Sequence, residues 1–233
     1  FPAASYKAGY INSAAVHIYL RSLCYNYIIL FVIIKGLRYN LSEEFICKGD
    51  EVMIYLGTDV EKEAAITVAK LMAAAAKTAP KGCGEDNVEV LILDGANKDR
   101  LTEAMREIGK EPEQEFFIRD AANIDASHCI LLIGAKNSPI GLEGCSYCGF
   151  ENCAEMVKAG ANCAFNITDL GIAVGSAVSV AADNRIDNRV LFSAGKAAVR
   201  SGFMSETVRV CYGIPLATAS KSVFYDRAEQ AEG

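Results

Sequence analysis

The stretch that decides the fold is Cys129-Ile130-Leu131-Leu132-Ile133-Gly134. Its unbroken apolar run is short and ends at a glycine, which is typical of a buried strand. Val88–Leu93 is a second apolar run of this kind, interrupted only by Glu89. Two shorter runs, 190–192 and 208–212, are predicted as further strands, and 213–227 is predicted to be irregular or extended.

Helical patterns alternate with these strands. An Ala-rich helix is predicted after Thr58-Asp59-Val60-Glu61, which has the spacing of a capping box, and it ends before Pro80. Residues 98–108 form a second predicted helix. The apolar segment 169–182 is predicted as a core helix, and 153–159 as a short helix closed by Gly160. Alternating helices and strands of this kind indicate an α/β (α+β) domain.

The composition is that of a globular protein. The chain has 233 residues, 52% hydrophobic and 22% charged, with a net charge of −6. No dense Lys/Arg cluster is present, so nucleic acid is not an expected partner. The nine cysteines are unevenly spread, and no signal peptide precedes them. This favours metal or redox chemistry in a reducing cytoplasm over a secreted disulfide scaffold.

The first 52 residues differ from the rest, because they hold 9 of the 20 Phe and Tyr residues. Their longest apolar run, 25–34, is too short to span a bilayer comfortably as a helix, so no membrane is expected as a partner. Lys48-Gly49-Asp50-Glu51-Val52 is a sequence that a purine-rich ribosome-binding site would encode ahead of Met53. We therefore expect 1–52 to be a doubtful extension, upstream sequence read through as protein, with 53–233 as the domain. An amphipathic or membrane-touching N-terminal arm is one alternative, and an ordinary extension with no special role is another.

Cysteines carry the clearest chemical signal. Cys145, Cys148, Cys153 and Cys163 fall within nineteen residues and are spaced Cys-x2-Cys-x4-Cys-x9-Cys. Thiolates brought together by short turns form a soft ligand set that selects an iron–sulfur cluster or zinc. Structural zinc sites usually pair two Cys-x2-Cys knuckles, and only one is present here. We expect a [4Fe-4S] cluster in segment 141–165, with zinc and plain buried or redox cysteines as alternatives.

Residues 145–153 resemble the Cys-x2-Cys-Gly-x3-Cys signature of the small 4Fe-4S domain of corrinoid iron–sulfur proteins and electron-transport subunits. In that domain the fourth cysteine typically lies farther downstream than Cys163. A wider resemblance covers 53–227 and concerns a family of uncharacterised ferredoxin-domain proteins of anaerobes. It is carried by five segments of this chain: 76–82, 116–120, 169–177, 187–189 and 213–221.

More remotely, the chain resembles the FMN-dependent nitroreductase fold in the order of Ala79-Pro80, 169–173 and 213–215. This resemblance implies a sheet with flanking helices, a cysteine loop inserted into it, FMN as a cofactor and a homodimer. The Arg-rich phosphate-binding motif of that family is absent. Lys81, Lys221 and Arg227 are the residues expected to bind the FMN phosphate in its place. Asn87 is the candidate for the edge of the flavin ring, and Ser193 and Gly195 are candidates to offer backbone N–H groups to the cofactor.

Two functions remain open at this point. The first is a redox enzyme, an oxidoreductase that pairs the cluster with FMN and exchanges electrons with a protein or small molecule. The second is a non-catalytic cluster- or zinc-binding module, or an electron carrier, that has lost its flavin. No acid–base pair stands out in the sequence, so no catalytic residue is predicted.

Overall fold

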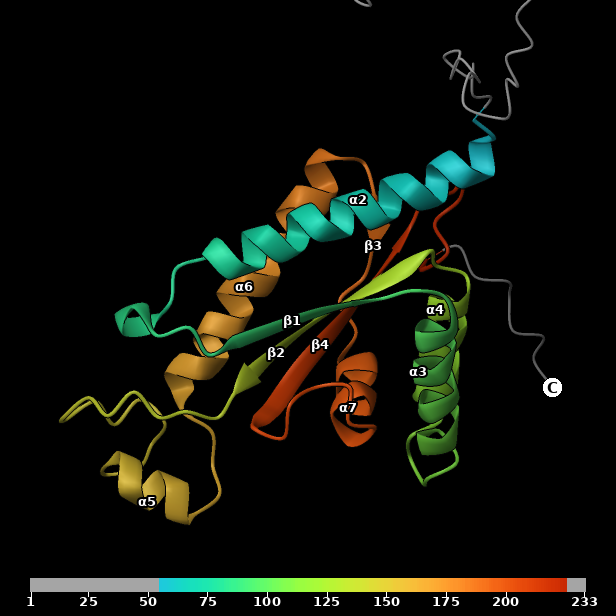
Figure 1. Cartoon of the computed structure of the whole chain (residues 1–233). Helices are drawn as coiled ribbons and strands as arrows, with labels where there is room; N and C mark the ends of the chain where they lie inside the picture. Colours follow the sequence, from blue (N-terminus) through green and yellow to red (C-terminus); the bar gives the residue numbers. More distant parts are fainter. Residues whose placement is uncertain (1–54, 226–233) are drawn as a thin grey trace, which may run out of the picture. The chain divides into compact units, whose positions relative to one another are not determined.

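The computed structural model describes residues 55–225. The chain divides into units of Phe1–Val52 and Met53–Gly233, and the described residues belong to the second unit. The predicted extension 1–52 lies outside the described residues. The elements in chain order are α2 (Gly57–Thr78), η1 (Gly82–Gly84), β1 (Val88–Leu93), α3 (Gly95–Ile108), α4 (Phe116–Asp125), β2 (Cys129–Lys136), α5 (Cys153–Lys158), α6 (Ala164–Asp183), β3 (Asp187–Asn188), α7 (Phe192–Arg200) and β4 (Val208–Ala217) (Figure 1).

The four strands form one antiparallel sheet in the order β1-β2-β4-β3. β2 is central and pairs with β1 through Val88–Ala135 to Leu93–Ile130, and with β4 from Cys129–Leu216 onward. All but the last of its residues are buried. The expectation of an α/β (α+β) domain with a sheet and flanking helices is therefore confirmed.

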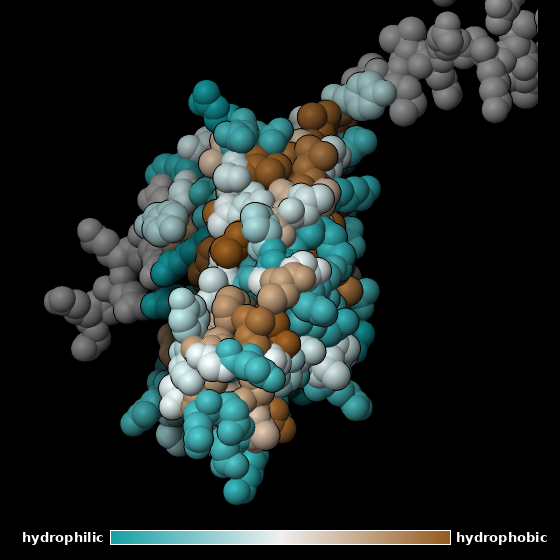
Figure 2. Space-filling model, turned by 90° about the vertical axis from the view of Figure 1, so that its left-hand side faces the viewer, coloured by the Kyte–Doolittle hydropathy of each residue, from teal (hydrophilic) through white to brown (hydrophobic). Residues whose placement is uncertain are grey.

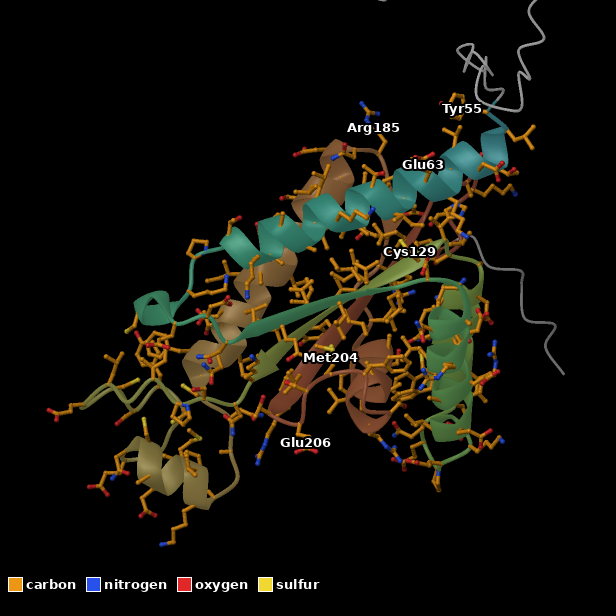
Figure 3. All side chains as sticks on the ribbon, in the orientation of Figure 1. Tyr55, Glu63, Cys129, Arg185, Met204 and Glu206 are labelled. Carbon is orange, nitrogen blue, oxygen red and sulfur yellow. The ribbon has the colours of Figure 1, made fainter. Side chains whose placement is uncertain are left out.

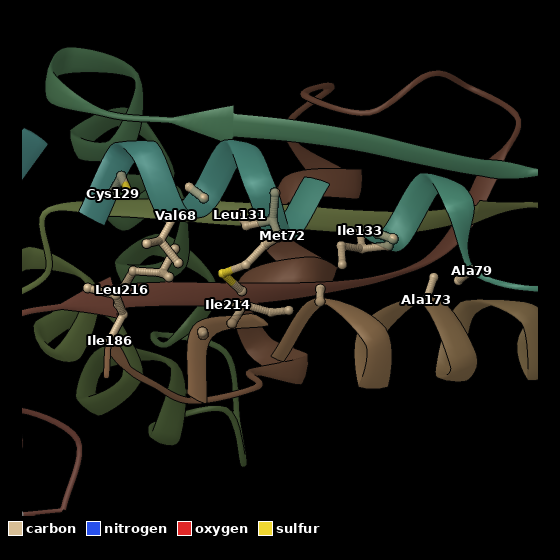
Figure 4. Packing of buried hydrophobic residues seen from close by; sticks show 14 of the residues in the cluster. Val68, Met72, Ala79, Cys129, Leu131, Ile133, Ala173, Ile186, Ile214 and Leu216 are labelled. Atoms are coloured by element: carbon tan, nitrogen blue, oxygen red, sulfur yellow. The ribbon is translucent and has the colours of Figure 1, made fainter. Parts of the chain in front are cut away.

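Each face of the sheet is covered by its own set of helices. Odd-numbered β2 residues such as Leu131 and Ile133 face a core shared with α2 and α6 (Figure 4). Even-numbered residues such as Ile130 and Leu132 face a second core shared with α3, α4 and α7. Because side chains alternate across a strand, the continuous apolar run of β2 supplies both cores at once.

α6 is the long apolar helix of the first core. Its length and composition would allow it to cross a membrane. It nevertheless packs alongside α2, and Leu170, Ala173, Ala177 and Ala181 are fully buried. It begins five residues before the predicted start at Asp169, so its first turn directly follows Cys163.

Some sequence predictions of element boundaries are wrong. No side chain caps α2, which begins at Gly57 after Leu56, so the predicted capping box is not formed. β4 continues to Ala217, because main-chain pairing with β2 carries the predicted strand through Pro215. The strand predicted at 190–192 is reduced to a single bridge between Leu191 and Gly213.

Helices α4 and α7 are absent from the sequence prediction. α4 buries Phe117, Asp120, Ala121 and Ile124, which is helical spacing, but the carboxylate at a core position obscured the pattern. α7 starts at Phe192, within the run that resembled a strand. Its Gly195 lies so close to β4 that a Cβ there would be 1.8 Å from the carbonyl oxygen of Cys211.

This close approach gives a test of the packing of α7 on β4. Gly195→Ala must push the helix off the strand, so we expect a loss of about 3 kcal/mol in the free energy of unfolding. Gly171→Ala is the matched control, since a Cβ at that position on α6 would meet no atom within 4 Å. It should stabilise by up to about 1 kcal/mol through helix propensity. Urea unfolding of both variants measures the difference, and equal stabilities would contradict the packing described.

Candidate metal centre

The four cysteines of the 141–165 segment line one hollow at the end of the sheet where β2 terminates. Three come from the loop before α5 and from its first residue, and Cys163 comes from the entry to α6. Figure 1 shows this segment projecting beyond the end of β2. The hollow is lined by Leu142, Cys145, Ser146, Tyr147, Cys148, Phe150, Asn152, Cys153, Met156, Cys163, Ala164 and Phe165.

The loop reaches this shape through tight turns. Gly149 donates its N–H to the carbonyl of Ser146 at 2.9 Å, which encloses Cys148 in a four-residue turn. Gly149 has a φ of 82°, a left-handed conformation that glycine adopts without steric cost. Asn152 then caps α5, because its side-chain oxygen accepts the N–H of Glu155 at 3.0 Å. The predicted short helix opening at Cys153 and closed by Gly160 is thus confirmed.

Cys163 occupies the N-cap position of α6. The first N–H groups of a helix lack intrahelical partners, and its dipole favours negative charge there. The first turn of α6 contains no acidic residue that would neutralise the positive end of this dipole. The thiol of Cys163 therefore belongs to the residue at which the N-terminus of the twenty-residue α6 begins.

Asn137, the first residue after β2, closes the base of the cysteine segment. Its amide nitrogen donates to the carbonyl of Ala161 at 3.2 Å, and its amide oxygen accepts the N–H of Cys163 at 3.4 Å. Arg209 of β4 adds a hydrogen bond to the carbonyl of Gly160 at 2.8 Å. One amide side chain therefore fixes Cys163 to the end of the central strand. The sequence analysis did not single out Asn137, although a polar residue directly after a buried strand could have indicated a structural role.

Aromatic packing joins the loop to α6. Tyr147 stacks on Phe165, with ring centroids 5.5 Å apart and planes 5° apart. The η1 turn also lies close to Phe165, since a Cβ on Gly82 would be 2.9 Å from Phe165 and from Ile140. The N–H of Gly82 donates to Asp169 at 3.0 Å. The exposed Cys83 is thereby held at the same end of the molecule as the hollow.

Among residues 55–225, no three His, Cys, Asp or Glu side chains lie close enough together to hold a single metal ion. Four thiols nevertheless line one hollow. A single zinc ion would require its thiolates about 4 Å apart, from Zn–S bonds of about 2.3 Å. A cubane binds each thiolate through a different iron, so its ligand sulfurs stand farther apart. Four cysteines are the number of thiolate ligands that either a cubane or a tetrahedral zinc ion takes.

Cys129 and Cys211 belong to the sheet and not to this site. Both are buried, and burial raises the pKa of each thiol to about 12. Cys129 lies at the start of β2, the end of the strand away from the cysteine segment (Figure 3). These two act as small hydrophobic residues of the core.

Lys81 and Asn87, expected from the nitroreductase resemblance to bind FMN, lie after the end of α2 and before β1. The Lys81 amine donates to the carbonyls of Ala76, Lys77 and Ala79 at 3.1, 2.7 and 2.8 Å, so it caps the C-terminal end of α2. The carbonyl of Asn87 accepts the N–H of Lys136 at 2.8 Å. Lys81 adjoins the core that α2 shares with α6.

Ser193 and Gly195 lie on α7, in the core on the opposite face of the sheet. The buried Ser193 hydroxyl donates to Asp120 at 2.7 Å, and Gly195 makes the close approach to β4. Lys221 is exposed after β4 and has a partner within the structure. Arg227 lies outside the described residues. The structure therefore does not gather the expected FMN ligands into one site, and their role in FMN binding stays a prediction.

The Asn137 contacts predict a local loosening on mutation. In Asn137→Ala, we expect the amides of 160–164 to exchange hydrogen about fivefold faster, since a hydrogen bond contributes about 1 kcal/mol. Asn184→Ala is the control, because it removes a hydrogen bond to Val180 at the far end of α6. Hydrogen exchange read by mass spectrometry separates the two. Unchanged exchange at 160–164 in Asn137→Ala would contradict the role of Asn137.

Thiol alkylation tests which cysteines are exposed and which are buried in the sheet. With iodoacetamide at pH 8, the exposed Cys83 should label in the folded protein. Cys129 and Cys211 should not, because their raised pKa leaves almost no thiolate at that pH. Peptide mass mapping, with urea-unfolded protein as the control, measures each site. Rapid labelling of Cys129 or Cys211 in the folded protein would show that the strands are not packed as described.

Comparison with solved structures finds nitroreductases. An FMN-bound nitroreductase of Desulfitobacterium hafniense has a TM-score of 0.46 and 15% identity over 66% of this chain and 78% of that chain. A putative NADH dehydrogenase/NAD(P)H nitroreductase of Bacteroides thetaiotaomicron has a TM-score of 0.44 and 13% identity, over 72% and 79%. Likeness at this level concerns the arrangement of helices and strands and says nothing of a cofactor in this chain.

Sequence comparison is more specific. An uncharacterized protein of Archaeoglobus fulgidus is 40% identical over 178 residues, which cover 73% of this chain and 95% of that protein. Residues 159–227, which include Cys163 and the strand β4, match a family described as "Uncharacterized protein containing a ferredoxin domain (DUF2148)". The chain therefore belongs to this family of ferredoxin-domain proteins.

Proposed function

We propose that the chain is an iron–sulfur redox protein in which Cys145, Cys148, Cys153 and Cys163 hold a [4Fe-4S] cluster. The observation that carries this proposal is the convergence of these four thiols on one hollow, although seventeen residues lie between the first and the last. The family description, which names a ferredoxin domain, supports it.

The setting of the four thiols also supports a cluster. An iron–sulfur cluster with four thiolates carries negative charge, which the N-terminus of α6 stabilises through its free N–H groups. Leu142, Phe150, Met156 and Phe165 supply the apolar part of the lining. Burial and hydrogen bonds of this kind tune the potential of a cluster.

When bound, such a cluster supplies the exchange of one electron at a time. The chain's own residues hold that centre in place: Asn137 fixes Cys163, Asn152 starts α5 at Cys153, and Gly149 shapes the turn around Cys148. We propose electron transfer as the function, because one-electron exchange is the chemistry that a cluster held by these four thiols would supply.

The finer prediction, an oxidoreductase that pairs the cluster with FMN, has less support. Lys81 and Ser193 lie on opposite faces of the sheet and their polar atoms bond within the fold. A homodimer and a cytoplasmic location likewise stay predictions.

The decisive experiment is anaerobic purification or reconstitution with iron and sulfide. We expect about four iron atoms per chain and a broad visible absorption that dithionite bleaches. Cys148→Ser should lower the iron content, because it removes one of the four thiolates. Cys83→Ser, the matched control outside the hollow, should retain it. Iron is measured by a colorimetric assay and the cluster by electron paramagnetic resonance.

Each alternative has its own outcome. A colourless protein with one zinc per chain would overturn the redox proposal in favour of a zinc-binding module. Unchanged iron in Cys148→Ser would remove that residue from the ligand set. Flavin absorption in the purified protein would support the oxidoreductase that pairs the cluster with FMN.

A further inference from the structure

We propose that the surface around the cysteine hollow is the docking face for a redox protein that carries a basic surface around its own redox centre. This inference rests on the proposed function, since it concerns the partner of the same site. The surface consists of Leu142, Glu143, Tyr147, Glu151 and Val157 and is called the cysteine-loop face below.

The apolar part of this face is unusually open. Leu142 and Tyr147 both line the hollow, yet they are 42% and 78% exposed. Val157 is 55% exposed and lies one helical turn after Cys153 on α5. Large apolar side chains gathered at one place on a surface mark an interaction site. Figure 2 looks onto this end of the molecule and shows hydrophobic surface bordered by hydrophilic surface.

Charge decides which partner fits. Segment 139–163 contains three acidic residues, Glu143, Glu151 and Glu155, and one basic residue, Lys158. The Lys158 amine lies 3.7 Å from the Glu155 carboxylate, so the charges of this pair cancel. Glu143 and Glu151, both exposed, are left as the net charge of the loop. A basic partner surface would be attracted to this loop, whereas an acidic one would be repelled.

Proximity makes the face suitable for electron exchange. Glu143 is two residues from Cys145 and Glu151 is two residues from Cys153, so each lies within about 8 Å of a cysteine Cα. A partner held by these charges would contact the exposed ring of Tyr147, which stacks on Phe165 in the lining of the hollow. Small, polar-rimmed contacts of this type suit brief redox encounters.

The test uses the reconstituted protein, reduced with dithionite and desalted anaerobically. It is mixed in a stopped-flow instrument with ferric cytochrome c, a basic protein, or with succinylated cytochrome c, which has the same haem and an acidic surface. One electron passes from the reduced cluster to the ferric haem, which becomes ferrous. At low salt we expect the native cytochrome to react about tenfold faster, and this advantage to disappear at about 0.3 M salt.

Charge-reversed variants locate the effect. Glu143→Lys/Glu151→Lys should slow the native cytochrome several-fold and speed the succinylated form. Glu103→Lys/Glu113→Lys, on α3 and in the loop after it, changes the net charge equally and should leave both rates within about twofold. Both variants are first checked for wild-type iron content, which separates loss of the cluster from loss of docking.

Three results would overturn the proposal while leaving the cluster in place. The two cytochromes could react at equal rates, both pairs of substitutions could act alike, or the reduced protein could transfer no electron to either form. Concentration-dependent self-association abolished by Glu143→Lys/Glu151→Lys would instead assign the face to a second copy of this chain. Failure to incorporate iron at all would refute the proposed function itself.

Discussion

β2 is joined by main-chain hydrogen bonds to β1 on one side and to β4 on the other, and helices cover both of its faces. Side chains of one short apolar run therefore enter two separate cores. This double burial accounts for the five helices on the sheet, because α2 and α6 pack on one face and α3, α4 and α7 on the other. The strand's end at Lys136 then fixes where the cysteine segment leaves the sheet.

At that exit, hydrogen bonds between side chains and the main chain hold the candidate site together. An excursion of more than twenty residues is closed where Asn137 bonds to Ala161 and Cys163. Closing so long a loop costs conformational entropy, and the hydrogen bonds of Asn137 and Arg209 offset part of it. The result places a thiol at the N-terminus of α6, where negative charge is stabilised.

Sequence patterns predicted β1 and β2 better than the helices α4 and α7 that pack on the sheet. Val88–Leu93 agrees with β1, and β2 begins at the predicted Cys129, because apolar runs of this length are distinctive of buried strands. α4 was missed since Asp120 occupies a core position, where Ser193 and Arg119 satisfy its carboxylate. The start of α7 was mistaken for a strand because 190–192 is an apolar run. In the structure, Leu191 makes one bridge and the helix then begins at Phe192. The hydrogen bond of Asp120 to Ser193 and the bridge of Leu191 to Gly213 both involve residues far along the chain, so a local sequence pattern does not show them.

The sequence by itself determined the chemistry: four closely spaced thiols form a soft ligand set whatever fold surrounds them. Local spacing also determined the short helix at Cys153, because its cap and closing glycine lie within a few residues. Only the tertiary structure decided that Cys163 shares a hollow with the other three, that α6 supports it, and that Ser193 and Gly195 serve packing. These results depend on contacts between residues far apart in the chain, which no local pattern encodes.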